Sequence, residues 1–302
     1  GFDSPTGCCP HRGGLAVATR RAIVTMQNVL GDGQRYEDRY SHCFVARTSH
    51  FLGELAPHDL ATSAQHPLFV SSRYSCVATV SPVHSFKMIW KPRFVSEIVP
   101  EDRCHLNGMA TTAGRLAFAT AFAESDALDG WREGLADGGI VIDTQSNRIV
   151  CRGLNMPHSP RFHDGRLWLL NSGTGELGAL RFRRSGAAVF EPLTALPGFA
   201  RGLALSGGFA FAGLSRPRYN DTHVAGSGHL SGSHDGAVRA GVVIIDLHSG
   251  EQVASLWLDN DVSEVYEVSV LKGVRCATAL RPGATESWGL VTMDAGPDCH
   301  SR

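Results

Sequence analysis

Short apolar segments separated by glycine-containing turns recur along the chain. In the clearest unit the segments are residues 105–111, 115–120, 139–144 and 148–152. Runs of about four to eight apolar and β-branched residues bounded by such turns predict β-hairpins. The same order of segments begins again at His158 and at Arg201. The pattern therefore predicts an all-β chain built from repeated units of four strands.

Two segments about one hundred residues apart are near copies of each other. Gly139-Ile-Val-Ile-Asp-Thr-Gln-Ser-Asn-Arg-Ile-Val resembles Gly241-Val-Val-Ile-Ile-Asp-Leu-His-Ser-Gly-Glu-Gln-Val. Repetition in register favours a β-propeller over a β-sandwich. Further units near residues 11, 58 and 264 complete the count. We predict one β-propeller domain over residues 1–302, with about six blades of four antiparallel strands.

Composition supports many short strands and narrows the choice of partners. Charged residues make up only 19% of the chain and glycines number 34, which suits tight turns better than long solvated helices. A net charge of −1 gives no electrostatic reason to expect nucleic acid or a membrane surface as partner. No apolar run approaches the roughly 18 residues of a membrane span. The eight cysteines include no C-x-x-C pair, and we expect buried thiols and a cytoplasmic protein.

Histidines recur at nearly equal intervals in the first half of the chain. His11, His58 and His105 are each 47 residues apart, and His158 follows after 53. Equivalent positions of propeller blades converge on the central axis, so these imidazoles should meet there. Neutral imidazole is the commonest metal ligand among side chains. We therefore expect a transition-metal ion, copper or iron before zinc, held by His58, His105 and His158, with His11 as a weaker fourth ligand.

The later units place different chemistry at the same level. Arg201 aligns with the histidines, and the last unit offers Glu264, Tyr266 and Glu267. Counting back from the turn at Lys272-Gly273 favours Glu267 as a general base, with Arg201 as a clamp for an anion. The alternative is that Arg201 and Glu267 form a structural salt bridge that seals the channel.

Two long insertions are expected over the same face. They span about residues 124–137 and 215–239, and loops of this length in a compact domain are usually functional lids or disordered segments. Trp131 in the first insertion is a candidate lid over a substrate, or else a buried anchor of the loop. Asn107 and Arg161 are candidate substrate contacts. Their alternatives are a turn role for Asn107 and an interblade hydrogen bond for Arg161.

Several motifs together resemble those of one protein family. They are Arg103-Cys-His-Leu-Asn-Gly, Met156-Pro-His-Ser-Pro-Arg, Leu170-Asn-Ser-Gly-Thr-Gly, Gly198-Phe-Ala-Arg-Gly-Leu and Phe211-Ala-Gly-Leu-Ser. The chain is similar, over roughly residues 55–275, to a bacterial family of conserved hypothetical proteins described as a propeller-like domain of unknown function. The resemblance implies the propeller fold and the importance of His105 and His158. It implies no reaction.

These observations favour a metal-dependent enzyme with a multi-histidine site at the mouth of the channel. Its arrangement resembles that of carotenoid-cleaving oxygenases, in which a propeller holds iron by histidines, and this analogy of architecture favours oxidation of a small molecule or peptide. A zinc-dependent lyase or hydrolase with Glu267 as base is the second enzymatic hypothesis. A non-catalytic propeller that binds a peptide is the third. The sequence leaves the substrate, the metal and the oligomeric state open.

Overall fold

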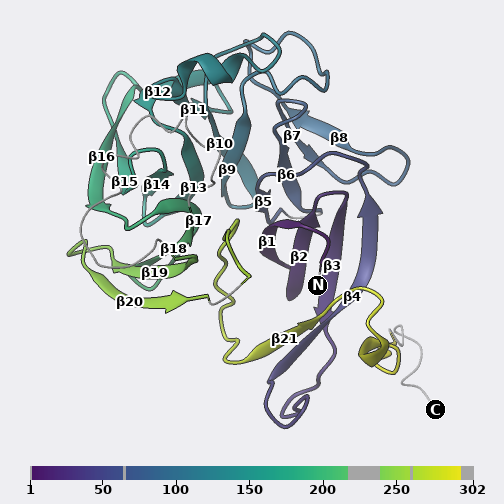
Figure 1. The fold of residues 1–302 in the computed structure, drawn as a ribbon. Coiled ribbons are helices and arrows are strands. Elements are labelled where there is room, and N and C mark those ends of the chain that lie inside the picture. Colours follow the sequence, from purple (N-terminus) through teal and green to yellow (C-terminus); the bar gives the residue numbers. More distant parts are fainter. Residues whose placement is uncertain (1, 64–65, 217–238, 259–260, 294–302) are drawn as a thin grey trace.

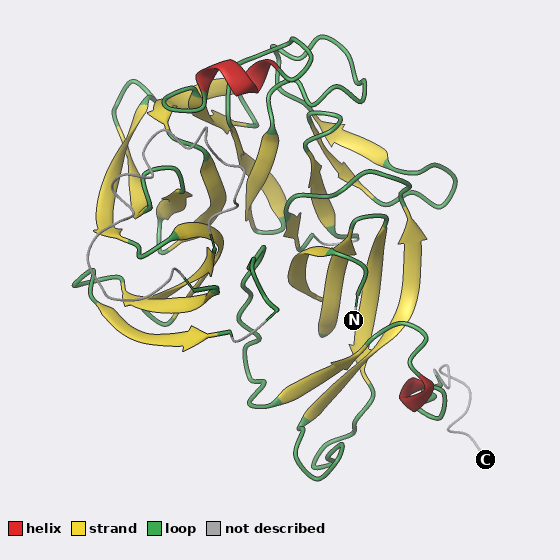
Figure 2. Cartoon of the chain, in the orientation of Figure 1, coloured by secondary structure: helices red, strands yellow, loops and turns green. Residues whose placement is uncertain are grey.

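The computed structural model describes residues 2–63, 66–216, 239–258 and 261–293. Within them the chain forms five sheets arranged around a common centre (Figure 1), which confirms the all-β propeller. The helical segments in these ranges are two short 3-10 turns, η1 (Gly130–Gly134) and η3 (Thr285–Ser287), at the periphery (Figure 2). No helix in the described ranges is long and apolar enough to cross a membrane.

Each blade is an antiparallel meander whose first strand lies nearest the centre. Blade 1 comprises β1 (Pro5–His11), β2 (Gly14–Thr19), β3 (Ala22–Asn28) and β4 (His42–Phe51). Blade 2 comprises β5 (Leu60–Ala61), β6 (Leu68–Ser71), β7 (Cys76–Thr79) and β8 (Lys87–Trp90). Blade 3 comprises β9 (Leu106–Thr112), β10 (Arg115–Ala121), β11 (Gly139–Asp143) and β12 (Arg148–Leu154). Blade 4 comprises β13 (Pro157–His163), β14 (Arg166–Asn171), β15 (Glu176–Phe182) and β16 (Ala188–Ala195). Blade 5 comprises β17 (Phe199–Ser206), β18 (Phe209–Ser215), β19 (Gly241–Asp246) and β20 (Gln252–Trp257).

The second strand of blade 4 shows how these apolar runs hold neighbouring blades together. Successive side chains of a strand point to opposite faces of the sheet. Leu167 and Leu169 of β14 accordingly pack in a cluster with residues of blade 3, and Trp168 and Leu170 pack in a cluster with residues of blade 5. A strand buried on both faces needs a continuous apolar run rather than an alternating one. This requirement explains the sequence Leu-Trp-Leu-Leu.

The prediction of six blades was wrong, because the last predicted unit does not form a sheet. Residues 261–276 contain no strand, and a stretch this short lacks the length for four strands and their turns. The segment instead lies between blades 5 and 1, seen in Figure 1 as the yellow-green chain between β18 and β1. Val265 N–H donates to Ser215 Oγ over 3.1 Å, and Ser269 Oγ donates to the carbonyl of Cys8 over 2.8 Å. We call residues 261–276 the wedge segment.

A glycine permits the close approach of the wedge segment to blade 5. Gly202 has a φ of +79°, and a Cβ atom built there would lie 2.7 Å from Cα of Glu267. Neither the conformation nor the space suits a larger residue. After the wedge segment, β21 (Ala277–Leu280) pairs in parallel with β4 and gives blade 1 a fifth strand.

Candidate functional site

Three of the predicted histidines meet at the ends of the inner strands where blades 2, 3 and 4 begin. His58 and His105 precede β5 and β9, and His158 is the second residue of β13. The ring centroids of His58 and His105 are 4.9 Å apart, and those of His58 and His158 are 6.3 Å apart. We call these three side chains the imidazole cluster.

A carboxylate orients one ring of the imidazole cluster. Nδ1 of His105 lies 2.8 Å from Oδ2 of Asp102, and the side chain of His105 is 15% exposed. A carboxylate oxygen accepts, so Nδ1 carries the proton and the lone pair of the neutral ring is on Nε2. Both residues have a positive φ, 46° for Asp102 and 48° for His105. Sequence reasoning missed Asp102, three residues before the histidine.

His158 is held in the same tautomer by a different set of acceptors. Its Nδ1 lies 3.0 Å from the carbonyl oxygen of Met156 and 2.9 Å from Oγ of Ser172. Ser172 Oγ donates its own proton to the carbonyl of Ala200 over 2.6 Å, and so it accepts from the imidazole. His158 thus links the start of blade 4 to blade 5 through the proton on Nδ1.

Arg201 joins the imidazole cluster from blade 5, at the level that the sequence predicted. Its Nη2 lies 2.6 Å from Nδ1 of His58, and its guanidinium carbon lies 3.8 Å from the ring centroid of Tyr266. Nη2 also lies 3.2 Å from Nε2 of His58, and since a guanidinium only donates, one ring nitrogen of His58 accepts and the ring is neutral. Arg201 is 7% exposed. The group therefore combines the positive charge of Arg201 with the neutral imidazole of His58.

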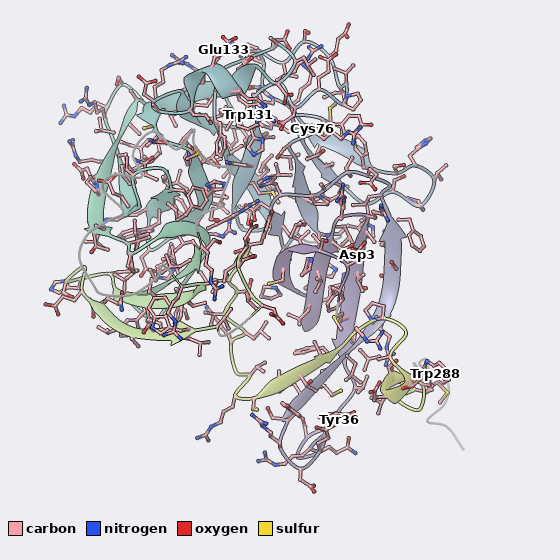
Figure 3. All side chains as sticks on the ribbon, in the orientation of Figure 1. Asp3, Tyr36, Cys76, Trp131, Glu133 and Trp288 are labelled. Carbon is pink, nitrogen blue, oxygen red and sulfur yellow. The ribbon has the colours of Figure 1, made fainter. Side chains whose placement is uncertain are left out.

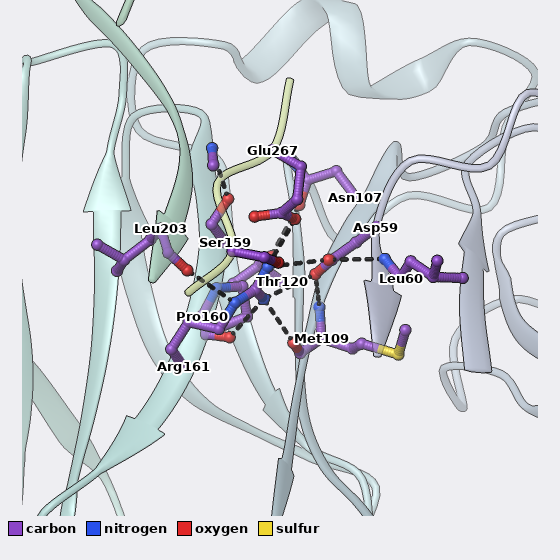
Figure 4. A network of polar contacts seen from close by, with 12 residues as sticks. Asp59, Leu60, Asn107, Met109, Thr120, Ser159, Pro160, Arg161, Leu203 and Glu267 are labelled. Carbon is purple, nitrogen blue, oxygen red and sulfur yellow. Dashed lines mark hydrogen bonds and ion pairs between the residues drawn. The ribbon is translucent and has the colours of Figure 1, made fainter. Parts of the chain in front are cut away.

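A second group of polar side chains lies beside the imidazole cluster. Two of its members, Asp59 and Glu267, directly follow His58 and Tyr266 in the sequence. Arg161 occupies its centre (Figure 4), where Nη1 and Nη2 each donate to Asp59 over 3.0 Å and Nη2 donates to Glu267 over 2.8 Å. Arg161 also donates to the carbonyls of Met109 and Leu203. It thus ties together blades 2, 3 and 5 and the wedge segment. We call Asp59, Arg161 and Glu267 the buried ion network.

The protonation state of this network follows from one guanidinium serving two carboxyl groups. Burial raises the pKa of Glu267 to about 8, Arg161 opposes the rise, and Asp59 adds to it. Burial acting alone would lower the pKa of Arg161, but the acidic side chains of Asp59 and Glu267 raise it. Glu267 therefore holds a proton at neutral pH while Asp59 and Arg161 form the ion pair. Glu267 pairs with Arg161 and not with Arg201, so the predicted salt bridge between Arg201 and Glu267 is not formed. Arg161 makes interblade hydrogen bonds, which was the alternative to a substrate contact.

Two other predicted residues lie outside the imidazole cluster. Asn107 is buried, donates from Nδ2 to the carbonyl of Pro157 over 2.9 Å, and accepts from Thr120 Oγ1 over 2.7 Å. It therefore joins blades 3 and 4. Glu264 lies in the wedge segment, next to Val265 beside β18.

His11 is not equivalent to the other three histidines. A Cβ on Gly7 would lie 3.1 Å from Cβ of Leu60, which places β1 and β5 side by side with Gly7 level with Leu60. His58 is then level with Pro5 at the start of β1, and His11 lies six residues further on, or about 20 Å at the rise of an extended strand. Burial, with Arg12 and His66 nearby, lowers the pKa of His11.

The first insertion reaches the imidazole cluster through Trp131. Its ring centroid is 4.4 Å from that of His105, and Figure 3 shows Trp131 on the inner side of η1 with Glu133 on the outer side. Phe122 packs against His105 and His158 at 4.5 and 5.3 Å, and Phe199 packs against His158 at 5.8 Å. Aromatic rings thus surround the imidazoles. Most of the second insertion, residues 217–238, lies outside the described residues.

The spacing of the rings bears on the metal hypothesis. Two imidazoles that share one ion at about 2.1 Å from each nitrogen have centroids about 5 Å apart when their bonds are near tetrahedral. The pair His58 and His105 has this separation, whereas His58 and His158 are further apart. In the part of the chain that the structure describes, no three His, Cys, Asp or Glu side chains are spaced to hold a metal ion.

Fold and site define a β-propeller with a histidine and arginine cluster at one end of its inner strands. The chain belongs to the family described as Domain of unknown function (DUF4915), which matches residues 1–280. The match includes the first fifty residues, beyond the range of the motifs. No curated protein matches the chain.

Solved structures with TM-scores above 0.5 share the fold at low sequence identity. A chain of a nidogen–laminin complex has a TM-score of 0.54 at 11% identity, covering 88% of this chain and 84% of that chain. A gluconolactonase from Xanthomonas campestris has a TM-score of 0.51 at 14% identity, covering 87% and 79%. The computationally designed Ika8 protein has a TM-score of 0.39 at 11% identity, and the match covers 88% of this chain and 65% of Ika8.

Proposed function

We propose that the chain is an enzyme in which His105 acts as general base and then general acid on a small molecule bound at the imidazole cluster. The observation that carries the proposal is the 2.8 Å hydrogen bond from Nδ1 of His105 to Asp102. A carboxylate in this position fixes the tautomer with its lone pair on Nε2 and stabilises the imidazolium formed when that nitrogen accepts a proton.

The surroundings of His105 fit proton transfer. Nε2 accepts a proton from a substrate C–H or O–H group, or from a water molecule, and returns it to the leaving or product atom. Arg201, about one imidazole away across His58, supplies positive charge to the side of the site where negative charge develops. The aromatic side chains around the cluster limit water, which strengthens both interactions.

The reaction class is therefore that of a lyase or hydrolase, with His105 rather than Glu267 as the base. Glu267 is unsuited to the role because its carboxyl group is held by Arg161 in the buried ion network. The similar fold of a gluconolactonase makes lactones and other esters the first compounds to test.

The experiment is a hydrolysis and elimination screen with lactones, esters and β-substituted acids, followed by kinetics of two variants. His105→Gln and Asp102→Asn should each lower kcat by about 100-fold or more, as expected when a general base is removed or wrongly oriented. His163→Gln is the matched control, because Nε2 of His163 lies 3.2 Å from Asp164 at the far end of β13. Its kinetics should stay unchanged. Full activity of both site variants would refute the proposal.

A metal-dependent reaction is the second candidate, supported by the anchoring of two imidazoles. Histidines that ligate metals commonly donate their other N–H to a carboxylate or a backbone carbonyl, as His105 does to Asp102 and His158 does to Met156. Copper or iron would support oxidation of a small molecule or peptide, and zinc would polarise the substrate of a lyase or hydrolase.

Elemental analysis of protein purified without a histidine tag separates the two candidates. Near-stoichiometric copper, iron or zinc that disappears in a His105→Ala/His158→Ala double variant supports the metal. Metal retained by the double variant would exclude this site. Activity that survives a chelator, in protein free of metal, favours the acid–base reaction of His105 alone.

A further inference from the structure

The first insertion is fastened firmly to the propeller beside the imidazole cluster. Asp126 accepts from the backbone N–H of Ser96 over 2.9 Å and from Arg103 over 2.6 Å, and Asp129 N–H donates to the carbonyl of Glu101 over 3.1 Å. A Cβ on Gly130 would lie 2.1 Å from Ser125 Oγ, so the turn into η1 is tightly packed. A loop held in this way places its side chains reproducibly.

Trp131 is the residue that the insertion delivers to the site. It is 8% exposed and is the buried residue of η1. One neighbour of its ring is the imidazole of His105 at 4.4 Å, and the guanidinium carbon of Arg132 lies 4.2 Å from the ring centroid. The indole is therefore held between protein groups and in contact with the proposed base.

The indole N–H of Trp131 finds no acceptor within the described part of the chain. Nε1 is buried and has no hydrogen-bond partner among the residues that the structure describes. A buried donor without an acceptor costs stability, and buried tryptophan N–H groups usually find a partner. A phenylalanine would fill most of the same space without this cost. The donor is thus explained if its acceptor belongs to a bound molecule.

We propose that Nε1 of Trp131 donates to an oxygen atom of the substrate, and that the substrate is a small molecule with a carbonyl or carboxylate oxygen near the proton that His105 transfers. The position of that proton rests on the proposed function, whereas the binding of the oxygen does not. A donor aimed at an oxygen on which negative charge develops stabilises it more in the transition state than in the ground state. Trp131 then selects substrates as well as covering them.

The test uses the full chain labelled with ¹⁵N-tryptophan and titrated with acetate as the carboxylate probe. Comparison with Trp131→Phe assigns the Trp131 indole resonance among those of the five tryptophans. We expect the Trp131 N–H proton to move downfield and saturate, and the Trp131→Phe protein to bind acetate at least about tenfold more weakly, the loss of one hydrogen bond to a charged acceptor. An indole resonance that stays in place throughout the titration, or equal acetate binding by the variant, overturns the proposal.

Trp90 provides a matched control, because its Nε1 is also buried and has no partner within the described ranges, but it lies in β8 on an outer strand. Trp90→Phe should bind acetate as the wild type does. Without acetate, Trp131→Phe should melt at a temperature equal to or above that of the wild type. A melting temperature well below that of Trp90→Phe would mean that the Trp131 N–H has a structural partner, which also overturns the proposal.

The two proposals fail separately. Unchanged kinetics in His105→Gln would refute the acid–base function and leave the titration of the indole fully interpretable. An unmoved indole resonance, together with loss of activity in His105→Gln, would refute the role of Trp131 and leave the function of His105 in place.

Discussion

The protonated carboxyl group of Glu267 makes the stability of the fold depend on pH in an unusual direction. Its pKa is about 8 in the folded protein, raised from 4.5 first by burial and then by Asp59. The folded state therefore binds a proton that the unfolded chain releases above pH 4.5. Stability from this group is complete below pH 4.5, falls as the pH rises to about 8, and is constant above that value.

The size of the effect follows from the interval between the two values. An interval from 4.5 to about 8 corresponds to about 5 kcal/mol, at about 1.4 kcal/mol for each pH unit. Relaxation of the surrounding structure reduces this upper bound, and we expect about 2–4 kcal/mol. Glu267→Gln keeps the shape and a neutral side chain at every pH, so it should remove this dependence.

The assay is urea unfolding of the wild type and Glu267→Gln at intervals from pH 5 to pH 9. The difference between the two proteins isolates Glu267, because the histidines titrate in both. We expect the variant to gain stability relative to the wild type as the pH rises. Glu191→Gln, at a surface pair with Arg181, should keep the wild-type slope. A difference that is constant with pH, or that grows as the pH falls, would refute the reasoning.

Three further substitutions test the packing of the propeller. Gly202→Ala should destabilise far more than Gly153→Ala in urea unfolding, since both have a φ near +80° but only Gly202 faces the backbone of Glu267; equal losses would contradict the close approach. Leu169→Ala should cost about 2–5 kcal/mol of unfolding free energy, because its fully buried side chain packs between blades 3 and 4, and a loss below 1 kcal/mol would argue against that packing. Arg161→Met should cost about 3–5 kcal/mol at pH 7 by leaving the Asp59 carboxylate buried without its ion pair, and Asp59→Asn in the same chain should recover part of the loss.

The repeat pattern predicted the propeller because each blade needs the same apolar runs and turns. The repeat pattern did not give the correct number of blades. The wedge segment packs beside blade 5 without pairing as a strand. The close contacts of Gly202 with Glu267 and of Gly213 with Val265 show this packing, and they join residues far apart in the sequence. A segment with strand-like residues and no partner edge has the same local sequence signal as a strand.

Equal spacing in sequence proved a poorer guide than register. The interval from His11 to His58 equals that from His58 to His105. His58 and His105 lie just before the first strand of their blades, whereas His11 is the last residue of β1 and so lies at the opposite end of its strand. Arg201 was found by aligning the starts of the inner strands, which is a statement about register. Intervals mix blade length with insertion length, and only the alignment of strands separates them.

The residues that sequence reasoning missed are partners rather than ligands or bases. Asp102 reaches His105 because both residues have a positive φ. This local backbone geometry has no sequence motif. Asp59 could have been suspected, since it follows His58 and successive residues at a strand start point to opposite sides. Its partner Arg161 is 102 residues away, and only the closed ring brings them together.

The position of the wedge segment in the sequence also sets the order in which the polar site is assembled during synthesis. Asp59, His105, His158 and Arg201 all precede it in the chain, so during synthesis the ribosome releases them before Tyr266 and Glu267 emerge. Until then Arg201 lacks the ring on which it stacks, and Arg161 holds one acid instead of two. A nascent propeller in which each of the five blades already has its four antiparallel strands would still lack Tyr266 and Glu267, and the wedge segment would supply both.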